Sequence, residues 1–127
     1  MSLRPVGIID IGSNSIKLLI AEQSAIGTIT SILFEVEETR IGEGMPGTPP
    51  HIDANAIAEG TQAIARLHDL ARTHDLHSLR IVATSAVRDA INRDVFIESV
   101  RRATGFQIEV LSGDQEARMI GKGLRCD

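Results

Sequence analysis

The sequence contains no tryptophan or tyrosine and has a single cysteine among its 127 residues. Aromatic side chains on which bases could stack are scarce. The 13 Lys and Arg residues are outnumbered by 17 Asp and Glu residues, which gives a net charge of −4, and they form no basic block. A dedicated nucleic-acid-binding function is therefore disfavoured. Cys126 cannot form an internal disulfide, which fits a reducing compartment.

Long hydrophobic runs are also missing. The apolar run near the N-terminus contains Asp10 and is too short to cross a bilayer. Met1 to Pro5 lack the charged-then-apolar layout of a signal sequence. We therefore expect no membrane segment and a cytoplasmic location. With 43% hydrophobic residues, the chain has enough apolar side chains for the core of one compact domain.

Hydrophobic periodicity predicts an α/β domain. Three apolar runs, at residues 6–11, 16–21 and 28–36, are predicted strands, and their short links favour antiparallel pairing. Downstream, helical and extended patterns alternate: a helix at 53–74 with Asp53 as its N-cap, a strand in "LRIVATSA" (79–86), a helix at 95–104 ended by Gly105, a strand in "FQIEVLS" (106–112) and a helix after Ser112. The order β-β-β-α-β-α-β-α predicts a mixed five-stranded sheet with helices on its faces.

The stretch "DIGSNS" interrupts the first two predicted strands with polar residues. Asp10 would end a central strand, so that its carboxylate emerges at an edge of the sheet, and Gly12 lets the backbone turn closely. Ser13, Asn14 and Ser15 offer hydroxyl, amide and backbone N–H groups. This pattern fits a phosphate cradle with a carboxylate placed for Mg²⁺. An ordinary turn is the alternative, because Gly, Ser and Asn are common in turns.

Two other motifs are rejected on context. Gly42, Gly44 and Gly47 match G-x-G-x-x-G, but the nearby prolines prevent a helix from starting there, so dinucleotide binding is not supported. The four histidines form no i, i+4 pair, which argues against a zinc site. We expect them to be solvated residues of helices and loops: His51, His68, His74 and His77.

The segment "VLSGDQEARMIGKG" and the earlier "ATSAVRDA" carry the remaining candidate residues. Ser112 and Gln115 match a capping box, which would place two acids, Asp114 and Glu116, in the first turn of a helix, where either would also favour the helix dipole. Arg88 follows a buried strand at its carboxyl end, where α/β folds place ligand-binding groups. Its planar fork suits phosphoryl oxygens, although pairing with a surface acid such as Asp89 would also explain it.

Four ordered motifs together resemble one family: "IDIGSNSIKLLIAE", "RIGEGM", "ATSAVRDAINRDVFIESVRRATG" and "IEVLSGDQEARMIGKG". They are similar to the N-terminal domain of the exopolyphosphatase and guanosine pentaphosphate phosphohydrolase family. The resemblance implies a ribonuclease-H-like fold of the actin, sugar-kinase and chaperone ATPase superfamily. It also implies a Mg²⁺-dependent hydrolase that removes terminal phosphate from polyphosphate or converts guanosine pentaphosphate to tetraphosphate.

The same resemblance implies roles for individual residues. Glu116 matches the catalytic glutamate, which orients and deprotonates the attacking water and lies at the metal. Asp10 matches the acid near the metal, and Arg88 matches the arginine that reaches the phosphate chain. The first phosphate-binding loop corresponds to Gly12, Ser13, Asn14 and Ser15.

One part of the family pattern is absent from the sequence. The family's second phosphate loop, an Asp followed by a glycine run and Ser or Thr, does not occur before Asp127. We therefore expect residues 1–127 to be a first actin-like domain that supplies half of an active site. The second domain of the same polypeptide would be its partner, and the fragment alone would not hydrolyse phosphate.

Three functions remain open at the level of sequence. The first is the phosphatase, with the choice between polyphosphate and guanosine pentaphosphate unresolved. The second is a fragment of a sugar or acetate kinase, which shares D-x-G-[ST]. The third is a non-catalytic regulator that binds guanosine polyphosphates. Whether the full-length protein is a homodimer also stays open.

Overall fold

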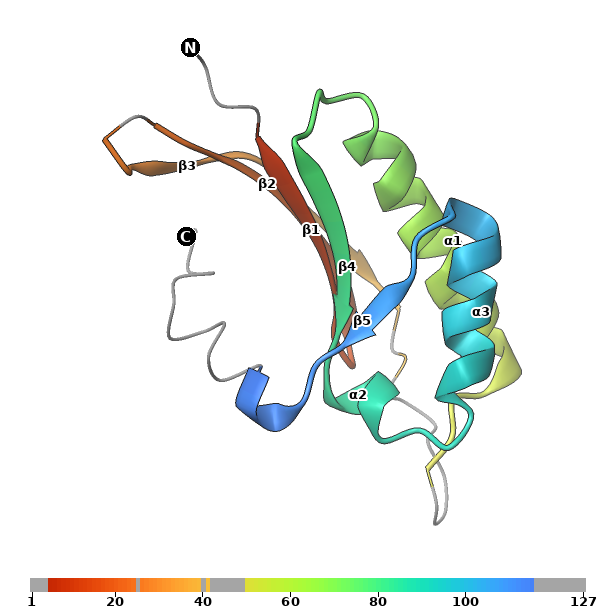
Figure 1. Cartoon of the computed structure of the whole chain (residues 1–127). Helices are drawn as coiled ribbons and strands as arrows, with labels where there is room; N and C mark the ends of the chain where they lie inside the picture. The colour runs from red at the N-terminus through yellow and green to blue at the C-terminus, as the bar shows by residue number, and fades with distance from the viewer. Residues whose placement is uncertain (1–4, 25, 40, 42–49, 116–127) are drawn as a thin grey trace.

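The computed structural model describes residues 5–24, 26–39, 41 and 50–115. The described residues form one sheet with the strand order β3-β2-β1-β4-β5. Two long helices lie side by side on one face of this sheet, and a short one lies beyond its end (Figure 1). In chain order the elements are β1 (Val6–Ile11), β2 (Ser15–Gln23), β3 (Ile29–Glu38), α1 (Ala54–Ala71), β4 (Ser78–Ala83), α2 (Ser85–Arg88), α3 (Arg93–Thr104) and β5 (Ile108–Val110).

The sheet is mixed, with β1 at its centre. β1 pairs antiparallel with β2, which pairs antiparallel with β3, as the short links require. On its other side β1 pairs parallel with β4, and β4 pairs parallel with β5, through connections that contain helices. The predicted fold class, a mixed five-stranded sheet in an α/β domain, is confirmed.

The core lies between the sheet and the helices α1 and α3. Ile9 and Ile11 of β1 are fully buried, while Ile8 and Asp10, which alternate with them, are only partly buried, because successive side chains of a strand point to opposite faces. The same alternation holds in β2. The fully buried strand side chains that face the helices are Ile9, Ile11, Ile16, Leu18, Ile20, Ile81 and Ala83.

Helix α1 begins and packs largely as its sequence predicts. The carboxylate of Asp53 accepts a 2.8 Å hydrogen bond from the backbone N–H of Ala56, which is the expected N-cap. The helix has an apolar stripe at three- and four-residue steps, and this stripe is buried at Gly60, Ile64, Leu67 and Ala71. A Cβ at Gly60 would lie 3.1 Å from the ring of Phe96, so this glycine allows the close contact between α1 and α3.

The structure corrects the bounds of several predicted elements. Helix α1 ends at Ala71, three residues before the expected end at His74. The stretch "LRIVATSA" is not a strand to its end: β4 stops at Ala83, and α2 follows from Ser85. The reason is the length of β1, because Ile11, its last residue, is opposite Ala83.

The last two elements also differ in length from the prediction. Helix α3 begins at Arg93, two residues earlier than expected, and ends at Thr104. Gly105 follows as its C-cap, with the left-handed φ of 81° expected of a glycine there. The strand expected over 106–112 is limited to Ile108–Val110, the three residues that have partners in β4.

One predicted solvated histidine is buried. His68 is on the inner side of α1 with only 7% of its surface exposed, and its ring contacts that of Phe106 edge-on at 5.2 Å. The prediction failed because His68 follows Leu67 on the apolar stripe, and an imidazole can pack there as an amphipathic ring. Burial lowers the pKa of His68, and the nearby charge of Arg72 lowers it further, against a smaller opposite effect of Asp69.

Burial of His68 predicts a loss of stability in mild acid. Because its folded-state pKa lies below the ordinary 6.5, the unfolded chain binds the proton more readily. The contribution to stability is complete above pH 6.5 and falls as the pH decreases toward the folded pKa. We expect the melting temperature to fall between pH 7.5 and 5.5, and to fall less for His68→Phe. The exposed His77→Gln should keep the wild-type slope, and equal slopes for all three proteins would contradict the prediction.

Candidate functional site

The carboxyl ends of the three parallel strands meet at one edge of the sheet. Ile11 of β1 is opposite Ala83 of β4, which is opposite Val110 of β5. The next residues continue the contact, since Thr84 N–H donates to the carbonyl of Ile11 at 3.4 Å and Leu111 N–H donates to that of Ala83 at 2.9 Å. The β1–β2 turn, α2 and the turn after β5 therefore leave the sheet at this lower end in Figure 1.

The β1–β2 turn is compact and closed by backbone contacts. Gly12 N–H donates to the carbonyl of Ser15 at 2.9 Å, and Thr39 N–H donates to that of Asn14 at 3.3 Å. A Cβ at Gly12 would lie 3.1 Å from the Ser15 oxygen, so glycine is needed here for space rather than for a left-handed φ. Ser13 and Asn14 are exposed, and their polar groups can reach a ligand in solvent.

Asp10 lies in the central strand as expected, but β1 ends one residue after it, at Ile11. It is partly buried and is opposite Lys17 in β2 and Val82 in β4. Because Ile9 and Ile11 face the helices, Asp10 lies on the other face of the sheet.

Arg88 is anchored at the same edge. It is the last residue of α2, and its Nη1 donates to the carbonyl of Leu111 at 3.0 Å, which ties α2 to the chain after β5. Its Nε is also 3.6 Å from a carboxylate oxygen of Asp89, so the expected surface pairing is present as well. Arg93 in turn donates to the backbone carbonyl of Arg88 at 2.9 Å.

The predicted capping box is confirmed. Ser112 N–H donates to Oε1 of Gln115 at 2.9 Å, and Gln115 N–H donates to Oγ of Ser112 at 3.1 Å. Asp114 is exposed in the helical turn that begins here. Glu116 follows directly in the sequence but lies outside the described residues, as do Cys126 and the glycines at 42, 44 and 47.

The predicted site residues that the structure describes therefore share one edge of the sheet: Asp10, Gly12, Ser13, Asn14, Ser15 and Arg88. Between residues 5 and 115, where they are described, no group of three His, Cys, Asp or Glu side chains could hold a metal ion. A lone carboxylate still fits Mg²⁺, because this ion usually binds through one or two carboxylates and completes its shell with water and phosphate oxygens. Asp10 is the described residue with the chemistry for that role.

Sequence reasoning missed two residues that hold separate segments together, one at the β1–β2 turn and one between α2 and α3. Thr39 is 6% exposed and contacts the Asn14 carbonyl, and its hydroxyl has no hydrogen-bond partner among the described residues. Asn92 bonds Ile52 twice, accepting from its N–H at 2.9 Å and donating to its carbonyl at 2.8 Å. Asn92 and Ile52 are 40 positions apart in sequence, so no local pattern could reveal their contact. For Thr39, the available signal was its position as a polar residue directly after an extended run.

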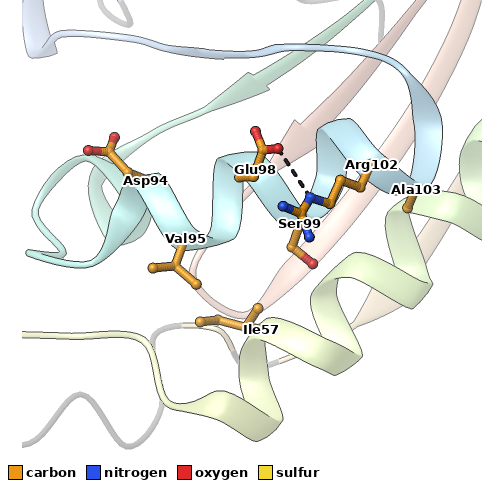
Figure 2. Close-up of a pocket in the computed structure, with 7 residues that line it drawn as sticks. All are labelled: Ile57, Asp94, Val95, Glu98, Ser99, Arg102 and Ala103. Atoms are coloured by element: carbon orange, nitrogen blue, oxygen red, sulfur yellow. Dashed lines mark hydrogen bonds and ion pairs between the residues drawn. The ribbon is translucent and has the colours of Figure 1, made fainter.

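An open groove on the outer side of α1 and α3 lies away from this edge (Figure 2). None of the predicted site residues lines it. Its most distinctive group is Glu98, whose pKa is lowered to about 2 by hydrogen bonds from Arg101 and Arg102. A carboxylate held ionised by two guanidinium groups on the surface is a weak base, so we assign no catalysis to this groove.

Comparison with known proteins agrees with the fold and the motifs. A family model described as the Ppx/GppA phosphatase family matches residues 9–126. The chain belongs to this family. It is 35% identical to "Exopolyphosphatase 2" of Mycobacterium tuberculosis over 131 aligned residues, which cover 97% of this chain and 41% of the relative.

Solved structures of Ppx/GppA proteins have the same fold. A family member from Aquifex aeolicus has a TM-score of 0.83 at 32% identity over 91% of this chain and 37% of its own. An exopolyphosphatase from Cytophaga hutchinsonii has a TM-score of 0.87 at 24% identity, over 96% of this chain and 38% of its own. The expected actin-like, ribonuclease-H-like fold is thus confirmed, and this Ppx/GppA chain spans about two fifths of the length of these relatives. None of its described helices has the length and apolar character of a membrane span.

The packing at Gly12 predicts that a methyl group there perturbs the loop of this Ppx/GppA chain. For Gly12→Ala we expect the free energy of unfolding in urea to fall by about 1 kcal/mol, because the Ser15 carbonyl must move. Gly113→Ala is the matched control, since a Cβ at this position would have no heavy atom within 4 Å. We expect the control to stay within about 0.5 kcal/mol of wild type. Equal effects of the two substitutions would refute this account of the loop.

Proposed function

We propose that this chain supplies half of the active site of a hydrolase that acts on a phosphoric anhydride. The substrate would be inorganic polyphosphate, from which a terminal phosphate is released, or guanosine pentaphosphate, which would become tetraphosphate. The observation that carries the proposal is the shared edge of the sheet. There the carboxylate of Asp10 and the polar turn after β1 lie at the end of one strand, and Arg88, tied to the Leu111 carbonyl, follows the neighbouring strand β4. The name of the 35% identical relative, an exopolyphosphatase, points the same way.

The described residues suit the binding of a phosphate chain. The hydroxyl groups of Ser13 and Ser15, the amide of Asn14 and the backbone N–H groups of the loop would donate to phosphate oxygens. Arg88 would add a permanent positive charge, and its bond to the Leu111 carbonyl limits the freedom of its side chain. Asp10 would hold Mg²⁺ directly or through water, and the bound ion would neutralise charge on the phosphate oxygens.

The reaction is a hydrolysis in which a water oxygen attacks the terminal phosphorus. The new P–O bond forms as the bond to the bridging oxygen breaks, and the shortened chain leaves with that oxygen and its charge. The proton of the water goes to Glu116 or to solvent. Little covalent chemistry falls to the protein, so positioning and charge neutralisation account for most of the rate.

The sequence predicts that Glu116 follows the capping box in the first turn of a helix. The bonds between Ser112 and Gln115 start a helix, and the positive end of the helix dipole favours the ionised form of an acid in its first turn. An acid stabilised in this way is a weaker base. We therefore assign Glu116 mainly to orienting the water.

The other half of the site would come from a second domain of the same polypeptide. The chain spans 41% of the relative in Mycobacterium tuberculosis, and its sequence has a single D-x-G-[ST] loop of the first type. Closure of a second loop over the phosphate chain would exclude water and complete the set of donors. A cytoplasmic location and a homodimer of the full-length protein stay predictions.

The role of Glu116 gives the first test of this function. In the full-length protein we expect phosphate release from polyphosphate or from guanosine pentaphosphate. Glu116→Gln should lower kcat by roughly 10² to 10⁴ and leave KM within a few-fold. Asp114→Asn removes a neighbouring exposed acid and should keep most of the activity. Binding of either substrate without hydrolysis by the wild type would instead indicate a non-catalytic regulator.

Asp10 and Arg88 should give different kinetic signatures. Asp10→Asn should raise the Mg²⁺ concentration needed for half-maximal rate, because a metal-binding carboxylate is lost. Arg88→Ala should raise KM at saturating Mg²⁺, because a charge matched to phosphate is lost. Arg102→Ala, at an exposed position on α3, is the control for removing a guanidinium group. Wild-type titrations for both site variants would favour an ordinary turn and a surface ion pair.

A further inference from the structure

Asn92 precedes α3 but its side chain does not cap this helix. The backbone carbonyl of Asn92 accepts from the N–H of Val95 at 3.0 Å, which opens the helix, yet its side chain makes no capping hydrogen bond. Asparagine is among the most favourable N-cap residues, because its side-chain oxygen normally accepts from a backbone N–H of the first turn. The side chain of Asn92 instead bonds a distant segment of the chain.

That segment is the one that leads into α1. Oδ1 of Asn92 accepts from the N–H of Ile52 at 2.9 Å, and Nδ2 of Asn92 donates to the Ile52 carbonyl at 2.8 Å. Next to this pair, the N–H of Ile91 donates to the carbonyl of Pro50 at 3.0 Å. We call these three hydrogen bonds the 52–92 bridge. One side-chain amide thus satisfies both backbone polar groups of a residue that is 1% exposed.

The 52–92 bridge also holds the backbone of Arg88. Ile52, Val87 and Ala90 belong to one buried cluster, so the bridge is fixed to the core. Between the bridge and Arg88, the N–H of Ala90 donates to the Val87 carbonyl at 3.2 Å, and the N–H of Arg93 donates to the Ala90 carbonyl at 3.3 Å. Nη1 of Arg93 donates to the Arg88 carbonyl at 2.9 Å. Consecutive short-range bonds therefore connect the end of α2 to the bridge.

Arg88 is consequently held through both its backbone and its side chain. The bridge places the backbone, and Nη1 of the guanidinium group donates to the Leu111 carbonyl. The side chain of Arg88 is still 29% exposed, so a ligand at this edge of the sheet can reach it. A guanidinium group binds phosphate oxygens through a planar pair of donors, and a small displacement of its backbone disturbs that geometry.

We propose that Asn92 is a positioning residue of the phosphate-binding site, because its bonds to Ile52 fix the backbone from which Arg88 reaches the substrate. The role rests on the proposed function, in which Arg88 binds the phosphate chain. Asn92 acts through Arg88 and is assigned no contact with the substrate. This role explains why an asparagine at a cap position bonds a residue 40 positions away instead of its own helix.

Steady-state kinetics of the full-length protein test this role, with whichever of polyphosphate and guanosine pentaphosphate it hydrolyses and at saturating Mg²⁺. Asn92→Ala removes both side-chain bonds of the bridge, and we expect KM to rise about fivefold while kcat changes less than about twofold. In an Arg88→Ala background the same substitution should change KM less than about twofold, because the group that it positions is absent. Asn55→Ala, at an exposed position of α1, is the matched control and should keep the wild-type KM.

Asn92→Ser separates positioning from stability and replaces the alanine variant if that variant does not fold. Serine is too short to bridge both polar groups of Ile52, but its hydroxyl group can cap α3 and so recover stability. We expect Asn92→Ser to melt at a higher temperature than Asn92→Ala and to show the same rise in KM, again dependent on Arg88. All rates are measured at a temperature at which circular dichroism shows the variants folded.

Three results would contradict the role of Asn92. A wild-type KM in Asn92→Ser, or an equal rise in KM with and without the Arg88 side chain, would mean that the bridge only stabilises the fold and would overturn the inference. Absence of phosphate release by the wild type from both substrates would overturn the proposed function, and the role of Asn92 with it. The two failures are distinguished by the wild-type assay alone.

Discussion

The central strand β1 determines the position of everything else in this domain. It pairs antiparallel with β2 on one side and parallel with β4 on the other, so the direction of the sheet changes at this strand. The antiparallel side needs only a tight turn, and the parallel side needs a helical crossover. Consequently the turn after β1 and the segment after β4 leave the sheet at the same end. As a result, the polar turn after β1 and Arg88 lie at the same edge of the sheet, although they are more than 70 positions apart in sequence.

The two faces of β1 carry residues of different character at alternate positions. Ile9 and Ile11 are fully buried under α1 and α3 and hold the strand in the core. Asp10, between them, is on the other face and only partly buried, so the same packing that fixes its backbone leaves its carboxylate near solvent. Arg88 is held differently, by a backbone carbonyl beyond β5. A rigid strand and a tied guanidinium group are what a charged ligand requires, since little ordering remains to be done on binding.

Local sequence signals were reliable where the interaction that they describe is itself local. The N-cap at Asp53, the left-handed Gly105 and the reciprocal bonds of Ser112 and Gln115 all involve residues within a few positions of one another. They are decided by backbone geometry and short side chains, whatever the rest of the chain does. The strand β1 was predicted with its correct bounds for a related reason, since its apolar run is ended by a glycine.

Two of the predictions that failed, the end of β4 and the exposure of His68, depended on contacts between distant parts of the chain. β4 ends where β1 ends, so the length of an apolar run near residue 80 was limited by a strand near residue 10. His68 is buried because Phe106, almost forty positions away, packs against it. The bond pair between Asn92 and Ile52 is another example. Propensity and periodicity contain no information about such partners.

The sequence by itself determined the class of fold, the types and order of the long helices and the strands, though not the short helix α2, and the residues whose chemistry suits phosphate. These follow from side-chain periodicity, turn residues and motif spacing, all of which are properties of short segments. Tertiary structure alone decided that Asp10, the polar turn and Arg88 share an edge, and that Ile32, Phe34 and Val36 of β3 are exposed. Both depend on strand order and register, which are set by the packing of α1 and α3 against one face of the whole sheet.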